Sequence, residues 1–181
     1  MFKKRYGYFV VSGLLLIIIL FIARFIPGGF LLVVKPVHGK GPAFIVPVKP
    51  TDCFTLHYFH SVNGLPVWEK HRIDEKGMIY IEEERFVAFN AGMGHWLGHG
   101  ALVDSGEFQI IKNINRPIGN FVIRIAQEKQ RHTIIAGDRS VNLSKVLAGK
   151  AVCVSVEKVS LLGRLWEMLF VKDIDSGSSP E

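Results

Sequence analysis

The chain has 181 residues, of which 49% are hydrophobic and 21% are charged, and this composition is too apolar for an intrinsically disordered protein. The formal net charge is +6, but the basic residues Lys3, Lys4, Arg5 and Arg24 near the start account for four of these charges and leave +2 for the rest. A nucleic-acid-binding protein carries its basic patch on the folded part, so this distribution argues against nucleic acid as a partner. The length favours one domain beside any membrane segment.

The first predicted element is a transmembrane helix over Tyr6–Ala23. This run has 18 residues and no charge, and as a helix it spans about 27 Å, close to the roughly 30 Å hydrocarbon core of a bilayer. The basic residues ahead of it predict a cytoplasmic N-terminus and an extracytoplasmic position for the remainder. A cleaved signal peptide is the alternative, but no Ala-x-Ala-like cleavage site follows the run. We therefore predict that residues 1–26 are a basic tip and an uncleaved signal anchor in the cell membrane.

Residues 27–159 are predicted to form an extracytoplasmic β domain. Short apolar runs recur between Gly, Asn and Pro residues, as is typical of strands joined by tight turns. No repeated helical crossover is present, so the fold class is all-β, with antiparallel strands in a β-sandwich or a barrel. One helical turn is predicted over 143–147. The predicted strands are 30–35, 43–48, 54–61, 67–73, 78–82, 85–89, 108–112, 120–126, 132–136 and 151–156.

Residues 160–181 are predicted to form a short amphipathic helix followed by a disordered tail. On a helical wheel, Gly163, Arg164 and Glu167 oppose a broad apolar arc. Such a helix either docks on the β domain or lies on the membrane surface beside the anchor, with Trp166 at the level of the lipid headgroups. The apolar arc comprises Leu161, Leu162, Leu165, Trp166, Met168, Leu169 and Phe170.

The two cysteines, Cys53 and Cys153, are a candidate disulfide. An even number of cysteines is expected to pair in an oxidising compartment. The bond requires that the strands carrying these residues lie side by side, because the Cα atoms of a disulfide are only about 4.4–6.8 Å apart. Two unpaired, buried thiols are the alternative.

The dipeptide Asn63-Gly64 predicts a two-residue hairpin turn. Such a turn pairs His60 with Val67 and Tyr58 with Glu69, which makes His60 and Glu69 diagonal neighbours on one face. A carboxylate beside an imidazole serves as a general base, a metal ligand or a structural ion pair, and the spacing does not choose among these. Ser61 points to the opposite face of a regular strand, which argues against a Ser–His nucleophile.

The seven histidines suggest a metal site, but their spacing does not support one. His95 and His99 share one face only in a helix, and the glycines around them argue against a helix. We therefore predict neither a metal nor another cofactor. Gly92 and Gly94 are candidate binding residues, in a loop that uses positive φ angles rather than in a phosphate-binding motif.

Several motifs in the N-terminal half occur together in one family. They are Phe54-x-Leu56-x-Tyr58-x-His60-Ser61-Val62, Pro66-Val67-x-Glu69, Glu83–Phe86 and Ala91-Gly92. On these motifs, the run from Phe30 to Gly94 resembles the small extracytoplasmic domain of unknown function encoded beside tripartite ATP-independent periplasmic (TRAP) transporters of the TAXI type. Glu84 stands where the resemblance leads us to expect threonine.

The resemblance implies an accessory role near a sodium- or proton-driven organic-anion importer. We accordingly predict a binding or assembly module, not an enzyme, that contacts the membrane subunit of the transporter or its solute-binding protein. His60, Ser61 and Glu69 would shape or stabilise the contact edge. The alternative is a metal-assisted extracytoplasmic hydrolase that uses His60 and Glu69, together with His95. A third interpretation is a structural protein of the cell envelope without a ligand.

Overall fold

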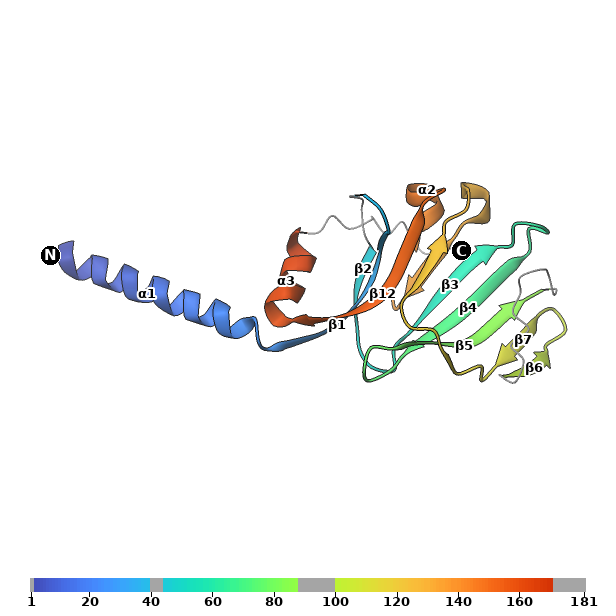
Figure 1. Ribbon diagram of the computed structural model, residues 1–181, viewed down its shortest axis with the longest axis horizontal. Coiled ribbons are helices and arrows are strands. Elements are labelled where there is room, and N and C mark those ends of the chain that lie inside the picture. Colours follow the sequence, from blue (N-terminus) through green and yellow to red (C-terminus); the bar gives the residue numbers. More distant parts are fainter. Residues whose placement is uncertain (1, 40–43, 88–99, 171–181) are drawn as a thin grey trace.

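A computed structural model describes residues 2–39, 44–87 and 100–170, with side chains given except at 2–10, 168 and 170. Helix α1 (Phe2–Ala23) projects from one end of a two-layer β domain, and helix α3 (Leu161–Phe170) lies near the junction (Figure 1). The backbone enters the domain directly after α1, because the first strand begins at Pro27. The predicted tail lies outside the described residues.

The smaller sheet joins the two ends of the β domain. Its first and last strands pair along their whole length, from Pro27 opposite Ser160 to Pro36 opposite Val152. The strand order is β2-β1-β12-β9, and every pair is antiparallel. Its strands are β1 (Pro27–Pro36), β2 (Phe44–Val48), β9 (Phe121–Arg124) and β12 (Ala151–Ser160).

The larger sheet has the order β11-β10-β3-β4-β5-β7-β6, and β8 pairs with β5 beside this path. All of its pairs are antiparallel, and the two sheets are not closed into a barrel, so of the predicted fold the β-rich, antiparallel part is confirmed. The segment from β9 to β10 contains the 3₁₀ helix η1 (Glu128–Gln130), and the predicted helical turn is α2 (Leu143–Leu147). The strands are β3 (Cys53–Phe59), β4 (Pro66–Ile73), β5 (Ile79–Phe86), β6 (Ala101–Asp104), β7 (Gln109–Lys112), β8 (Arg116–Pro117), β10 (Thr133–Ala136) and β11 (Arg139–Asn142).

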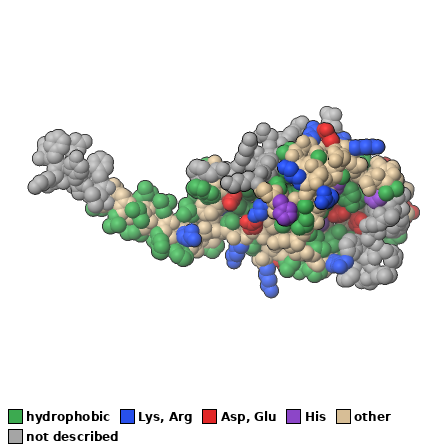
Figure 2. Space-filling model, turned by 45° about the horizontal axis from the view of Figure 1, so that its top comes forward, with side chains coloured by type: hydrophobic (Ala, Val, Ile, Leu, Met, Phe, Trp, Pro, Cys, Tyr) green, Lys and Arg blue, Asp and Glu red, His purple; other side chains and the backbone are tan. Residues whose placement is uncertain are grey.

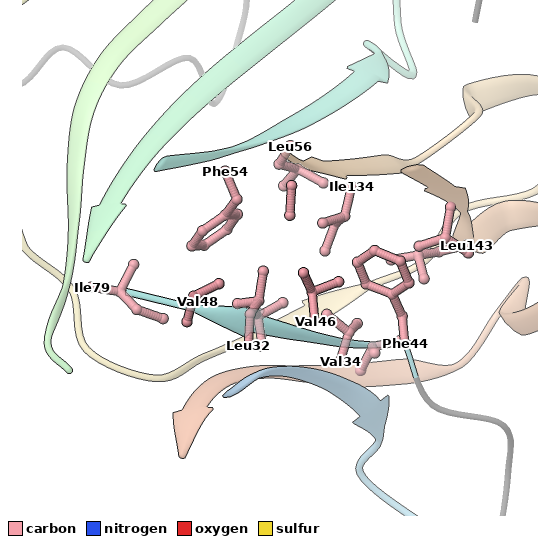
Figure 3. Close-up of a cluster of buried hydrophobic side chains, with 14 of the residues drawn as sticks. Leu32, Val34, Phe44, Val46, Val48, Phe54, Leu56, Ile79, Ile134 and Leu143 are labelled. Atoms are coloured by element: carbon pink, nitrogen blue, oxygen red, sulfur yellow. The ribbon is translucent and has the colours of Figure 1, made fainter. Parts of the chain in front are cut away.

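The main core fills the space between the two sheets. Side chains from both sheets point toward one another there (Figure 3), among them Leu32 and Phe44 from the smaller sheet and Phe54 and Ile134 from the larger. Each of these four is at most 1% exposed, and full burial of such a side chain stabilises a fold by roughly 1.5–3 kcal/mol. This apolar layer therefore holds the two sheets together.

Strand β5 is continuous where the sequence predicts two strands, over 78–82 and 85–89. The pairing with β4 shifts from Lys70 opposite Glu83 to His71 opposite Ile81, which leaves Glu82 as the extra residue of a β-bulge. The bulge changes the alternation of β5, so Ile81 and Glu84 both face the interior although they are three positions apart. A glutamate that strict alternation places outside is therefore buried.

Helix α1 exposes its apolar side chains. From Val11 to Ile22 the large apolar residues of this helix are 45–66% exposed, and Figure 2 shows hydrophobic side chains along the visible face of the described part of the helix. Over the described residues, no helix combines the length and the apolar character that a membrane crossing requires. The membrane span predicted for Tyr6–Ala23 stays a prediction.

Gly77 is expected to tolerate alanine poorly. Its φ angle is +84°, and an added Cβ atom would lie 2.9 Å from Cε1 of Phe30, a ring that packs on the main core. Gly106 has nearly the same φ angle, +83°, but open space around the Cβ position. Gly106→Ala should therefore cost only the left-handed backbone strain, about 1–2 kcal/mol, and Gly77→Ala should cost about 1 kcal/mol more because of overpacking. Equal losses in denaturant unfolding would contradict the packing of Phe30 on this turn.

Candidate functional site

The β3–β4 hairpin closes with a four-residue loop, Ser61–Gly64, and not with the predicted two-residue turn. The N–H of His60 donates to the carbonyl oxygen of Leu65 (2.8 Å), and the N–H of Gly64 donates to that of His60 (2.9 Å). Asn63 Oδ1 accepts a hydrogen bond from the N–H of Leu65 (3.0 Å). The asparagine that predicts a tight turn therefore closes a wider one.

The wider loop shifts the pairing of the hairpin. Tyr58 lies opposite Val67, and Leu56 lies opposite Glu69. The predicted proximity of His60 to Glu69 is therefore wrong. Glu69 lies opposite Leu56, and Leu56 is four positions, or about 13 Å along the strand, from His60. The shift is an even number of residues, so Glu69 keeps the face that the alternation predicts.

That face carries a group of polar side chains inside the domain, which we call the interior polar cluster (Tyr58, Glu69, His71, Glu84 and His132). The hydroxyl of Tyr58 donates a 2.9 Å hydrogen bond to Glu69 Oε1. Burial, followed by the negative charge of Glu69, raises the pKa of Tyr58 well above its ordinary value, so the phenol remains a donor. The ring of His132 stacks on Tyr58 at 5.2 Å, and its buried Nδ1 atom has no hydrogen-bond partner among the described residues.

His71 lies between two aromatic rings. It stacks on Phe54 at 4.8 Å and on Phe121, from the other sheet, at 5.3 Å. Nδ1 lies 3.1 Å from the carbonyl oxygen of Glu69, and it must donate because a carbonyl only accepts. Burial lowers the pKa of His71 to about 4, although this hydrogen bond opposes the change. The imidazole is therefore neutral at physiological pH.

Glu69 and Glu84 lie directly opposite each other on neighbouring strands, and Glu84 is only 3% exposed. Burial raises the pKa of Glu69 to about 7; the hydrogen bond from Tyr58 opposes the rise, and the charge of Glu84 adds to it. His71 Nε2 lies 3.8 Å from Glu69 Oε2. Because the imidazole loses its proton at a lower pH than this carboxyl, the two groups do not form an ion pair.

The cluster can bind and release a proton near neutral pH, because the pKa of Glu69 falls there. Among residues 2–39, 44–87 and 100–170, no group of three or more His, Cys, Asp or Glu side chains is arranged to hold a metal ion. Sequence reasoning selected Glu69 as a site residue but missed Tyr58, His71, Glu84 and His132. A detectable signal was the alternation Val67-x-Glu69-x-His71-x-Ile73, which places two polar residues on the apolar face of β4.

His60 and Ser61, two of the predicted binding residues, lie instead at the tip of the hairpin. Together with the segment around η1 they line a pocket of about 350 Å³. Its walls include the basic residues Lys129 and Arg131, which sequence reasoning did not select. In chain order they are about 70 residues from the hairpin, and only the pairing of β10 with β3 brings the two segments together. The predicted binding residues Gly92 and Gly94, and also His95 and His99, lie outside the described residues.

Both cysteines are free thiols, so the candidate disulfide is absent from the structure and the alternative of two unpaired thiols holds. Cys53 is in the larger sheet and Cys153 is in the smaller one. Their neighbours Phe54 and Val154 point into the core between the sheets, so the two thiols point away from that core on opposite sides. The first and last strands are indeed neighbours, but Cys53 is on neither of them. Burial raises the pKa of the Cys53 thiol, which lowers its reactivity at neutral pH.

The chain was compared with known proteins. No curated protein and no solved structure matches it. Residues 54–143 match the family model of a domain of unknown function, DUF1850, and this region runs from β3 to the first residue of α2. It therefore contains the β3–β4 hairpin, the described interior polar cluster and both walls of the pocket at the hairpin tip. The chain carries a DUF1850 domain.

Proposed function

We propose that the protein is a membrane-anchored extracytoplasmic accessory module of a TRAP-type organic-anion transporter of the TAXI class. The observation that carries the anchor is the apolar surface of α1, whose large side chains between Val11 and Ile22 are 45–66% exposed. Water is a poor environment for such a surface, and lipid is a good one. The family resemblance of Phe30–Gly94 supports a transporter as the partner. The DUF1850 match names no partner, so it adds nothing to this point.

Helix α3 also supports a module that lies at the membrane surface. Its N–H at Leu161 donates to the carbonyl oxygen of Ile26 (2.8 Å), and Arg164 Nη1 donates to that of Gly28 (3.1 Å), so α3 is held at the end of α1. Trp166 is 59% exposed and Leu169 is 72% exposed. An amphipathic helix with an exposed tryptophan beside an anchor fits the interfacial layer of a membrane. The exposure of these two side chains favours the membrane-surface alternative over a helix that is only docked on the domain.

The hairpin tip is the proposed contact edge for the partner. Figure 1 shows this tip at the end of the domain that lies away from α1. His60 and Ser61 are on this tip, whereas Glu69 lies between the two sheets and would stabilise the hairpin that carries the tip. An anchor confines the module to the layer in which a transporter subunit is found, and the raised effective concentration makes a weak interface sufficient. The hydrolase alternative gains no support, since His60 and Glu69 do not converge.

Site-specific crosslinking tests this proposal. A photoreactive amino acid is placed at Ser61, on the tip, and as a matched control at Lys158, an exposed residue of the smaller sheet. Intact cells that contain the transporter are irradiated, and the captured protein is identified by mass spectrometry. We expect the Ser61 probe, and not the Lys158 probe, to capture the membrane subunit or the solute-binding protein of the transporter. Capture of neither component from Ser61 would overturn the proposed partner.

A further inference from the structure

We infer that the pocket at the hairpin tip binds a small organic anion through its carboxylate groups. The pocket has a volume of about 350 Å³ and lies between the loop Ser61–Gly64 and the segment that ends η1. Ligand pockets in proteins range from about 300 to 1,000 Å³, so this one suits a small molecule.

The charge of the pocket favours an anion. Lys129 and Arg131 are both exposed and both line it, and no Asp or Glu is among its lining residues in the described ranges 2–39, 44–87 and 100–170. Neither basic side chain has a hydrogen-bond or ion-pair partner in the part of the chain that the structure describes. The pairing of β10 with β3 brings the segment of Arg131 beside the hairpin. Two cations therefore line the pocket together with the hairpin loop.

Arg131 is held at this place by its backbone. It ends η1 in the left-handed conformation, with a φ angle of +48°, which costs a residue with a side chain roughly 1–2 kcal/mol. Its N–H donates to Glu128 O (3.1 Å), and its carbonyl oxygen accepts a hydrogen bond from Thr133 Oγ1 (2.9 Å). The backbone is therefore fixed on both sides while the guanidinium stays available to a ligand.

The remaining walls indicate an organic acid rather than an inorganic anion. Phe59 and Val62 supply apolar surface for a hydrocarbon skeleton, and Ser61 and Asn63 supply polar groups around it. Inorganic phosphate would leave the apolar walls uncovered. A guanidinium presents two parallel N–H groups that match a carboxylate, and a neighbouring ammonium can hold a second one. A small dicarboxylate can pair one carboxylate with each cation and place its hydrocarbon skeleton against the two apolar side chains.

This inference rests on the proposed function only in using the same hairpin tip, and it names the ligand class of that tip. The two ideas fail separately. Anion binding is measured on the purified chain alone, whereas the proposed partner is tested by crosslinking in cells.

Isothermal titration calorimetry on the full chain in detergent micelles tests the inference, with succinate as the probe and ionic strength held constant with sodium chloride. The uncharged succinamide has the same skeleton and serves as the ligand control. We expect saturable binding of succinate at one site and none of succinamide. The double variant Lys129→Gln/Arg131→Gln should bind succinate about tenfold more weakly or worse, since two charge-assisted contacts are lost.

The control variant Lys112→Gln/Lys158→Gln removes the same charge from exposed positions outside the pocket and should bind succinate as the unmodified chain does. Three results would overturn the inference. They are the absence of saturable succinate binding, an equal loss of binding in both double variants, and tighter binding of inorganic phosphate than of succinate. Thermal unfolding of each variant shows whether a lost signal reflects a lost fold.

Discussion

Replacing Glu69 with glutamine is expected to stabilise the protein above pH 7. The pKa of this carboxyl is about 7 in the folded protein, against 4.5 for an ordinary glutamate. At pH 8 the folded state therefore carries a partly buried charge that costs about 3 kcal/mol relative to the unfolded chain, whereas below pH 4.5 the group is protonated in both states. Glutamine keeps the shape of the glutamate side chain and can still accept the hydrogen bond from the Tyr58 hydroxyl, but it never ionises. Glu69→Gln should thus gain about 3 kcal/mol at pH 8 and almost nothing at pH 4.

Glu69 and His71 give the stability of the fold opposite dependences on pH, because folding raises the pKa of Glu69 and lowers that of His71. Because the pKa of Glu69 is raised on folding, the contribution of Glu69 to the free energy of unfolding is fully present below pH 4.5 and is lost as the pH rises to 7. The pKa of His71 is lowered from 6.5 to about 4, so its contribution is present above pH 6.5 and is lost as the pH falls to 4. The two effects oppose each other between pH 4.5 and 6.5. In Glu69→Gln only the second remains, and the stability of this variant should rise with pH over that interval.

Thermal unfolding of the full chain in detergent, followed from pH 4 to pH 9, measures this effect. A gain of 3 kcal/mol corresponds to a rise in Tm on the order of 10 °C for a chain of this length. Glu107→Gln, at an exposed position, is the matched control and should follow the unmodified protein throughout. If the curves of Glu69→Gln and the unmodified protein ran parallel at all pH values, Glu69 would not titrate differently in the folded and unfolded states, and the interior polar cluster would be misdescribed.

Phe54→Ala is expected to cause the largest loss of stability. The ring is 1% exposed, packs in the main core between the sheets, and stacks on His71 with an interplanar angle of 9°. Truncation of a buried phenylalanine costs about 3–5 kcal/mol, because transfer free energy is lost and a cavity remains. The cavity would also open one side of His71, whose low pKa depends on burial. We therefore expect the pKa of His71 to rise toward its ordinary value.

Denaturant unfolding measures the loss, and an NMR titration of the imidazole measures the pKa. Phe54→Leu keeps most of the volume and should cost less than about 2 kcal/mol. Val122→Ala, at a side chain that is 60% exposed, should change stability by less than about 0.5 kcal/mol. A loss in Phe54→Ala no larger than that of Val122→Ala would show that this ring does not join the two sheets.

Much of the fold could be predicted, because most strands alternate in the ordinary way. Strands β1, β3, β4 and β12 and helices α2 and α3 lie close to their predicted positions. The sequence does not reveal β11, since Arg139–Asn142 has only one large apolar residue and its stability comes from pairing with β10. Two strands, over 78–82 and 85–89, are predicted where the structure has one, because the bulge at Glu82 lets β5 continue through Glu82–Glu84.

The candidate site was less predictable, because it depends on pairing between distant segments. Asn63-Gly64 predicts a turn but not its length, and the side chain of Asn63 stabilises the wider loop through the N–H of Leu65. That difference separates His60 from Glu69. The inward position of Glu84 depends on a bulge that no local signal marks. Lys129 and Arg131 reach the hairpin tip only through the tertiary fold.

The side of the membrane on which the β domain lies can be measured with two reporter proteins. Alkaline phosphatase, which is active only after export, and green fluorescent protein, which fluoresces only when it folds in the cytosol, are fused separately behind Glu181 in a bacterial host. We expect high phosphatase activity and no fluorescence, and the reverse pattern when residues 2–23 are deleted. Fluorescence without phosphatase activity from the full-length fusions would contradict an anchored, extracytoplasmic module.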